Sequence, residues 1–73
     1  MKYFFVYLEN HTDRQDDVVL KIRSNTKLQA VAEATNNFSP SRFSISNVMT
    51  RKQLKKFDPV WHALLWGRKA LNE

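Results

Sequence analysis

Two stretches near the start of the chain have side chains typical of β-strands. Residues 2–9 (KYFFVYLE) are rich in aromatic and β-branched side chains and carry apolar residues on both faces, which favours a central strand or an edge strand with a recognition face. Residues 17–23 (DVVLKIR) direct Val18, Leu20 and Ile22 to one face, the pattern of a half-buried strand. We expect the two strands to form an antiparallel hairpin, joined by the polar stretch NHTDRQDD.

The period of the apolar residues becomes helical after the second stretch. Thr26, followed three residues later by Gln29, fits a capping box. An apolar stripe then recurs at helical spacing: Leu28, Val31, Ala32, Thr35 and Phe38. These signals predict a helix over roughly residues 26–38 that packs this stripe on one face of the sheet. Apolar residues that alternate with serines then predict a third strand over about residues 42–49.

The last third of the chain combines basic and apolar residues. Thr50 can cap a turn through RKQLKKF, and Asp58 followed by Pro59 is a good start signal for a further helix. Because this helix would be apolar on nearly every side, it must be buried. It either packs on the face of the first strand that carries the tyrosines, or is loosely ordered alone and folds onto a partner.

These elements predict an α+β fold, a small antiparallel sheet with one packed helix in the order ββαβ. We expect residues 1–49 to form this core and residues 50–73 to form a basic and apolar C-terminal segment, helical or partly ordered. The 73 residues allow one small domain, which buries about 60 % of its unfolded surface. Such a chain has little room for a deep active site, which favours a binding protein over an enzyme.

The net charge of +5 comes entirely from the end of the chain. Residues 1–41 hold five basic and five acidic groups, whereas residues 42–73 hold seven basic groups against two acidic ones. The seven cations are Arg42, Arg51, Lys52, Lys55, Lys56, Arg68 and Lys69. This asymmetry predicts a polyanion or an acidic protein surface as the partner, with a solvated face that aids solubility as the alternative.

The sequence offers no recognised catalytic or metal-binding arrangement. Cysteine is absent, and the histidines, His11 and His62, are distant in the sequence. The single glycine, Gly67, cannot build a phosphate-binding loop. His62 lies on an apolar helix, where a packed or half-exposed role is more common than a ligand role. We therefore expect no enzyme activity, no cofactor and no metal.

Two groups of residues are candidates for partner binding. The basic residues of RKQLKK fall at i, i+1, i+4 and i+5, which gathers them on one side of a helix and suits phosphate groups. The aromatic row of the first strand is similar to the stacking platform of sheet-based RNA binders, unless the segment with the two tryptophans covers it. Aromatic residues, arginine and open strand edges equally suit a protein partner. The candidate partner-binding residues are Tyr3, Phe5, Tyr7, Arg42, Arg51, Lys52, Lys55 and Lys56.

The whole chain resembles a family of very small bacteriophage regulatory proteins. Its length, its opening KYFFVYLEN, its ββαβ order and the basic RKQLKK before DPVWHALLW are similar to the inhibitor and antiterminator of bacterial RNA polymerase from a Xanthomonas phage. The resemblance implies binding to host RNA polymerase near the RNA exit region, reduced promoter-dependent initiation and read-through of intrinsic terminators. In that role the basic cluster would face nascent RNA or an acidic polymerase surface, and the first strand would contact protein.

Two other functions stay open on the residues alone. One is a small basic RNA- or DNA-binding protein that acts by itself, whose affinity would fall steeply as salt rises. The other is a phage inhibitor of another host complex, such as a CRISPR effector.

The apolar runs of the chain are short. Residues 3–8 are too few for a signal-peptide core, and no run approaches the ~20 residues of a membrane span. We therefore expect a cytoplasmic protein with no membrane contact. The resemblance to phage proteins implies that this cytoplasm is that of a host bacterial cell, and we also expect a monomer.

Overall fold

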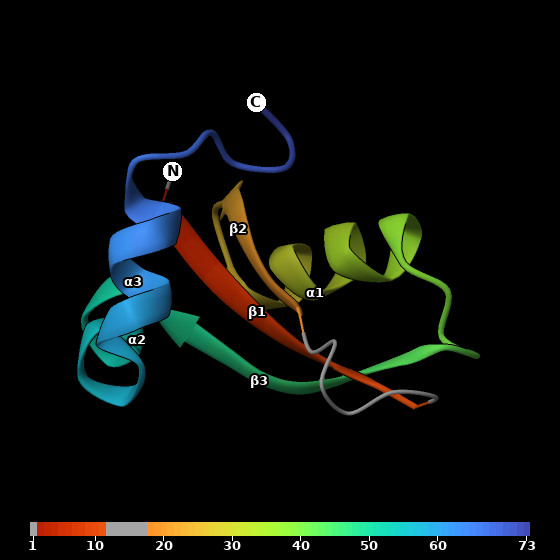
Figure 1. The fold of residues 1–73 in the computed structure, drawn as a ribbon. Coiled ribbons are helices and arrows are strands. Elements are labelled where there is room, and N and C mark those ends of the chain that lie inside the picture. The colour runs from red at the N-terminus through yellow and green to blue at the C-terminus, as the bar shows by residue number, and fades with distance from the viewer. Residues whose placement is uncertain (1, 12–17) are drawn as a thin grey trace.

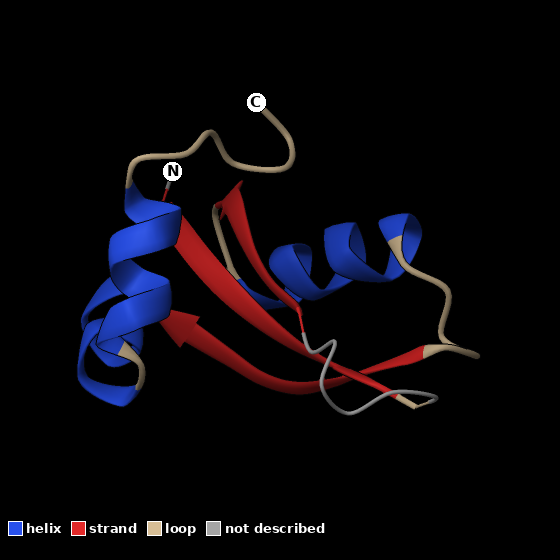
Figure 2. Ribbon diagram, in the orientation of Figure 1, coloured by secondary structure: helices blue, strands red, loops and turns tan. Residues whose placement is uncertain are grey.

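The computed structural model describes residues 2–11 and 18–73 and shows an α+β fold (Figures 1 and 2). Most of the expected polar loop and the first residue of the expected second strand lie outside the described residues. The elements in chain order are β1 (Lys2–Asn10), β2 (Val18–Ser24), α1 (Lys27–Asn37), β3 (Phe43–Thr50), α2 (Arg51–Phe57) and α3 (Pro59–Trp66). The expected ββαβ order is thus followed by two further helices.

Strand β1 lies in the middle of the sheet. The strand order is β2-β1-β3, and β1 is antiparallel to both neighbours. Helix α1 lies on one side of the sheet and the helix pair α2–α3 on the other (Figure 1). A central strand covered on both faces must be apolar on both, which accounts for the sequence of β1.

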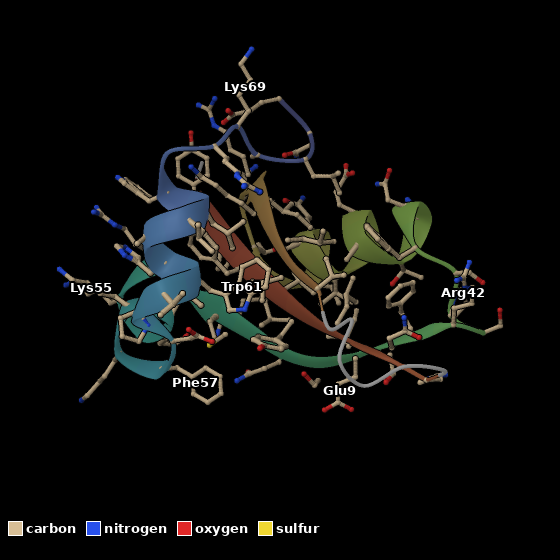
Figure 3. The ribbon with its side chains drawn as sticks, in the orientation of Figure 1. Glu9, Arg42, Lys55, Phe57, Trp61 and Lys69 are labelled. Atoms are coloured by element: carbon tan, nitrogen blue, oxygen red, sulfur yellow. The ribbon has the colours of Figure 1, made fainter. Side chains whose placement is uncertain are left out.

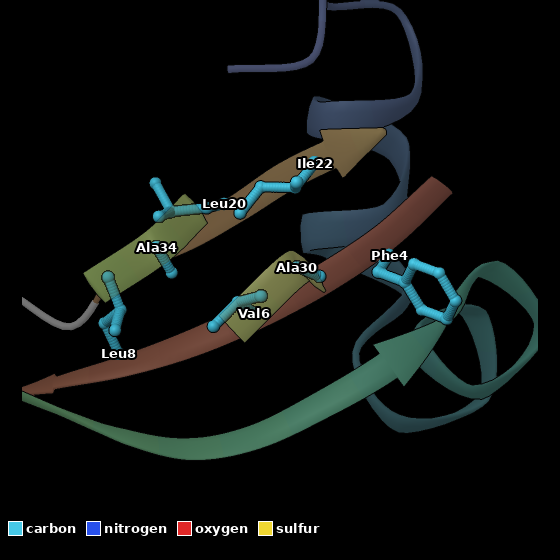
Figure 4. Packing of buried hydrophobic residues seen from close by; sticks show 7 residues of the cluster. All are labelled: Phe4, Val6, Leu8, Leu20, Ile22, Ala30 and Ala34. Carbon is cyan, nitrogen blue, oxygen red and sulfur yellow. The ribbon is translucent and has the colours of Figure 1, made fainter. Parts of the chain in front are cut away.

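Helix α1 covers its face of the sheet through alanines. The buried residues of this core are Phe4, Val6, Leu8, Leu20, Ile22, Ala30 and Ala34 (Figure 4). The predicted stripe is wrong in its first part, because Leu28 is 79 % exposed whereas Ala30 and Ala34 are fully buried, but its last residue is correct. Short side chains let the helix lie close to the sheet, and Phe38, four residues after Ala34, packs against the same core.

The start of α1 is the one that the sequence predicts. Thr26 is the N-cap, and its hydroxyl accepts a hydrogen bond from the Gln29 N–H at 3.2 Å. The Gln29 side chain does not complete the predicted capping box, because it accepts from the Asn25 N–H at 3.1 Å and not from the N-cap residue.

A bulge in β3 lets odd- and even-numbered residues reach the α1 core. The pairing of β3 with β1 shifts between Tyr7 and Leu8, so that Ser46 is an extra residue in β3. Its hydroxyl donates a hydrogen bond to the Tyr7 carbonyl oxygen at 3.3 Å. Because of this extra residue, Ile45 and Val48 both pack against the α1 core.

The helix pair α2–α3 covers the second face of the sheet. Thr50 and Gln53 form a capping box at the start of α2, while Asp58 is the N-cap of α3 and Pro59 begins it. The buried residues of this second core are Phe5, Val19, Met49, Leu54 and Leu65, with Tyr3, Tyr7 and Trp61 packed against them. The C-terminal helix therefore packs on the tyrosine face of β1, the first of the two arrangements expected for it.

Strand β2 differs from the half-buried strand that the sequence predicts. Lys21, on the face expected to be polar, is only 8 % exposed, and Val19 on the same face is also buried. The reason is that α3 and the residues after it extend over this face.

None of the helices in residues 2–11 and 18–73 is long and apolar enough to cross a membrane.

The end of the chain covers the outer edge of β2. The Leu71 N–H donates a hydrogen bond to the Lys21 carbonyl oxygen at 2.7 Å. The Asn72 side-chain amide accepts from the Arg23 N–H at 3.0 Å and donates to the Arg23 carbonyl oxygen at 2.6 Å. The amide thus bonds the edge as the backbone of a neighbouring strand would.

Candidate functional site

Helix α2 presents four exposed cations: Arg51, Lys52, Lys55 and Lys56. Leu54, between them in the sequence, is fully buried in the second core. Burial of this leucine fixes the rotation of α2 and turns the cations away from the sheet. The spacing of the basic residues in the sequence thus corresponds to one exposed helical face.

Three of these cations line a groove of about 630 Å³ between the start of β1, α2 and the end of α3. Lys2 is the fourth cation of its walls, whereas Lys56 does not line it. The remaining lining residues are Tyr3, Phe4, Thr50 and Trp66. Lys2 is close to α2 because Phe4 lies opposite Thr50 in the β1–β3 pairing. Because no local sequence pattern predicts how β1 and β3 pair, Lys2 could not be assigned to the site from the sequence.

Arg51 is held against Trp66 and His62. The centre of its guanidinium lies 3.6 Å from the centroid of the Trp66 ring, a cation–π contact. Its Nε–H donates a hydrogen bond to His62 Nε2 at 3.3 Å, and the His62 ring stacks on Trp66 with ring centroids 6.1 Å apart. These contacts fix the guanidinium at the wall of the groove.

The pKa of His62 is lowered from its ordinary value. Desolvation is the largest cause, followed by the positive charges of Arg51 and Lys55. The lowered pKa favours the neutral imidazole. In this form Nε2 has a lone pair that accepts the hydrogen bond from Arg51.

Lys21 of β2 binds the end of α3 to the sheet. Its buried ammonium donates hydrogen bonds to the carbonyl oxygens of Trp66 at 3.0 Å and Arg68 at 2.8 Å. The same nitrogen lies 4.5 Å from the centroid of the Tyr3 ring and 4.7 Å from that of Trp66. The carbonyl oxygens after a helix have no partner within the helix, so this lysine satisfies two of them and positions the aromatic walls of the groove.

Tyr3 connects the groove to the end of the chain. Its hydroxyl donates a hydrogen bond to Glu73 Oε1 at 2.7 Å, which raises the pKa of Tyr3 and lowers the pKa of Glu73. Its ring meets Trp66 edge to face, with ring centroids 5.9 Å apart. Both the hydroxyl and the ring of Tyr3 therefore make contacts within the protein.

The aromatic row of β1 is not an open stacking platform. Phe5 is 0 % exposed, beneath Leu54 and Leu65, and belongs to the core, so the expectation that it contacts a partner is corrected. Tyr3 and Tyr7 are half-buried, and the Tyr7 ring meets Phe57 edge to face, with centroids 6.2 Å apart. The helix pair α2–α3 covers this row, the alternative that the sequence had left open.

Arg42 lies apart from the other cations. Figure 3 shows it at the opposite end of the molecule from Lys55, beyond the end of α1, with Lys69 at a third place near the C-terminus. The seven basic residues of the C-terminal part therefore do not share one surface. The structure brings together those of α2 and adds Lys2 to them.

Helix α3 has an apolar strip that faces solvent. Val60 and Leu64, one turn apart, are 68 % and 49 % exposed, and Phe57 at the end of α2 is also exposed. The inner side of α3 packs on the sheet through Trp61 and Leu65. One helix pair thus carries a cationic face and an apolar strip.

The α2 cations form no ion pair within the part of the chain that the structure describes. Within residues 2–11 and 18–73 the only ion pair joins Arg23 to Glu73 at 3.9 Å, so none of the α2 cations has a carboxylate within 4 Å there. The same part of the chain contains no group of three or more histidine, aspartate or glutamate side chains that could bind a metal ion. The exposed cations of α2 therefore form a local concentration of positive charge.

Comparison with known proteins adds one finding. No family model, no curated protein and no solved structure matches this chain.

Proposed function

We propose that this chain is a phage regulatory protein that binds host RNA polymerase in the bacterial cytoplasm, inhibits initiation and promotes antitermination near the RNA exit channel. One observation carries the proposal: the helix pair α2–α3 exposes the cations of α2 and the apolar strip Val60–Leu64 on one unit. The resemblance of the chain to phage inhibitors of RNA polymerase supports the choice of partner.

The exposed residues suit a protein partner. Interfaces combine an apolar centre with a polar rim, and a few well-packed apolar or arginine residues supply most of the affinity. Both faces of the sheet are already covered, and the outer side of α2–α3 carries exposed apolar residues and cations together, as such a contact requires. A small basic protein is also attracted to an acidic patch on a large enzyme, which speeds association.

In this proposal the regulatory effect comes from the cations of α2, next to the apolar strip through which the protein docks. Bound next to the RNA exit channel, the α2 cations would meet the phosphates of the emerging transcript. A transcript held along a cationic surface is less free to fold into a terminator hairpin, which favours read-through. A protein docked at this place would also oppose the rearrangements that initiation requires.

Affinity capture from a bacterial lysate tests the proposal. We expect the tagged protein to retain RNA polymerase at about 150 mM salt, the physiological range, with and without nuclease. Leu64→Glu should reduce the retained polymerase about tenfold or more, as loss of an interface anchor does. Leu28→Glu is the matched control, because Leu28 is an exposed leucine on α1, across the sheet.

The outcomes separate the possible functions. Failure to retain polymerase, or equal retention by the two variants, would contradict the proposal. Retention that disappears with nuclease would instead favour a protein that binds nucleic acid by itself. A transcription assay with the purified enzyme should show reduced initiation and increased read-through of an intrinsic terminator.

A further inference from the structure

We infer that the groove between the start of β1, α2 and the end of α3 binds the phosphodiester backbone of a single-stranded nucleic acid. The inference deepens the proposed function and rests on it only for the identity of the strand, which in that setting is the nascent transcript.

The charges of the groove suit a chain of phosphates. Four cations from two elements surround it, Lys2 from β1 and three from α2, and no carboxylate is among its lining residues. None of these cations has an acidic partner within 4 Å in the described residues. Cations gathered around a concave surface without counter-charges bind a polyanion and release its counterions, which is the main source of affinity for nucleic acids.

Arg51 is preorganised for this contact. Its Nε–H is occupied by His62 and its plane lies over Trp66, while the terminal nitrogens of the guanidinium carry the other four N–H groups. An arginine already fixed in position loses less side-chain entropy on binding, and its terminal nitrogens can pair with two oxygens of one phosphate.

The shape and walls of the groove favour a single strand. About 630 Å³ is within the range of small-molecule sites, enough for a nucleotide or two but too small for a duplex. A broad acidic protein surface does not fit into a concave groove, whereas a thin, flexible strand does. Tyr3 and Trp66 are among the lining residues, so the groove has apolar walls on which sugars can pack. Because Arg51 already lies over the Trp66 ring, we expect no base to stack there and little sequence preference.

Fluorescence anisotropy of the purified 73-residue chain with a labelled single-stranded RNA of about 12 nucleotides tests the inference. Three to four phosphate contacts predict a slope of log affinity against log salt of about −2 to −3. The affinity should then fall about 20- to 50-fold between 50 and 200 mM salt. Single-stranded DNA of the same sequence should bind similarly, because the groove is expected to read phosphates.

The sharpest comparison is between Lys55→Gln and Lys56→Gln. The two lysines are adjacent on α2, exposed and equal in charge, but only Lys55 lines the groove. We expect Lys55→Gln to weaken binding severalfold and to make the salt slope less steep by about 0.7, the contribution of one contact to a single strand. Lys56→Gln should leave the slope unchanged. Circular dichroism checks that both variants stay folded.

Four results would overturn the inference: no binding of RNA at 50 mM salt, equal effects of the two lysine variants, equal affinity for duplex RNA, or equal affinity for polyglutamate, which would indicate an acidic peptide as ligand. The nuclease-treated polymerase capture is an independent readout. If the protein retains polymerase but does not bind RNA, only the inference about the groove is overturned. If it binds RNA but does not retain polymerase, only the proposed function is overturned.

Discussion

The ammonium of Lys21 donates a hydrogen bond to the carbonyl oxygen of Trp66 at 3.0 Å and lies 4.7 Å from the centroid of the indole ring of the same residue. Lys21 belongs to β2 and Trp66 ends α3, so one side chain holds the last turn of a helix to the sheet. The Trp66 ring in turn supports Arg51 at the groove. A buried lysine of the sheet therefore positions a cation that faces solvent.

Lys21→Met should destabilise the protein. Methionine keeps the apolar stem but removes two charge-assisted hydrogen bonds and leaves two carbonyl oxygens without a donor. We expect a loss of about 2 to 3 kcal/mol in the free energy of unfolding, measured in urea. Lys69→Met is the control for loss of a charge at an exposed position and should stay within about 0.5 kcal/mol of the wild type. Equal stability of the two variants would mean that Lys21 does not anchor α3.

Two leucines that look alike in the sequence should differ sharply in their effect on stability. Leu54 is fully buried between α2 and the sheet, whereas Leu28 is exposed. Leu54→Ala should cost about 2 to 5 kcal/mol through lost burial and the cavity that remains. Leu28→Ala should change the free energy of unfolding by no more than about 0.5 kcal/mol. A large effect of Leu28→Ala would contradict the rotation of α1 described above.

The alanine contact of α1 gives a further prediction. Ala34 is completely buried against the sheet, so Ala34→Leu should force the helix outward and cost about 1 to 3 kcal/mol. Ala32→Leu, an exposed position of the same helix, should have little effect. Thermal unfolding followed by circular dichroism would measure both, and a destabilised Ala32→Leu with an unchanged Ala34→Leu would reverse the assignment of the buried face.

His62 should make the stability depend on pH. Its pKa is lower in the folded protein than the ordinary value of 6.5, so the unfolded chain binds its proton first as the pH falls. The stability from neutral His62 is complete above pH 6.5 and is lost as the pH falls through the lower, folded pKa. An NMR titration should show the imidazole midpoint below 6.5. Arg51→Gln should raise this midpoint only partly, because desolvation and Lys55 remain; a wild-type midpoint at or above the ordinary value would refute the prediction.

The features that the sequence predicts correctly depend on neighbouring residues. Thr26 and Asp58 are recognisable as caps because a cap bonds to backbone groups within the same turn. The cationic face of α2 is also predictable, since the angle between residues of one helix is fixed.

The features that the sequence misses depend on contacts between distant segments. Hydrophobicity favours Leu28 for the buried stripe, but the distance between α1 and the sheet favours the small Ala30 and Ala34. The position of Lys2 in the groove depends on the β1–β3 register. Phe5 changes from a candidate contact to a core residue because residues some fifty positions later fold over it.

The asymmetry of the sheet edges limits how copies of this protein can associate. The Asn72 amide and the Leu71 N–H occupy backbone groups of β2 that an incoming strand would need, whereas β3 has a strand on one side only within the described residues. Two molecules that pair through β3 would form a closed, two-fold dimer with no exposed β3 edge left. Growth into a continuous cross-molecular sheet, the route to fibrils, is thereby blocked at the second molecule.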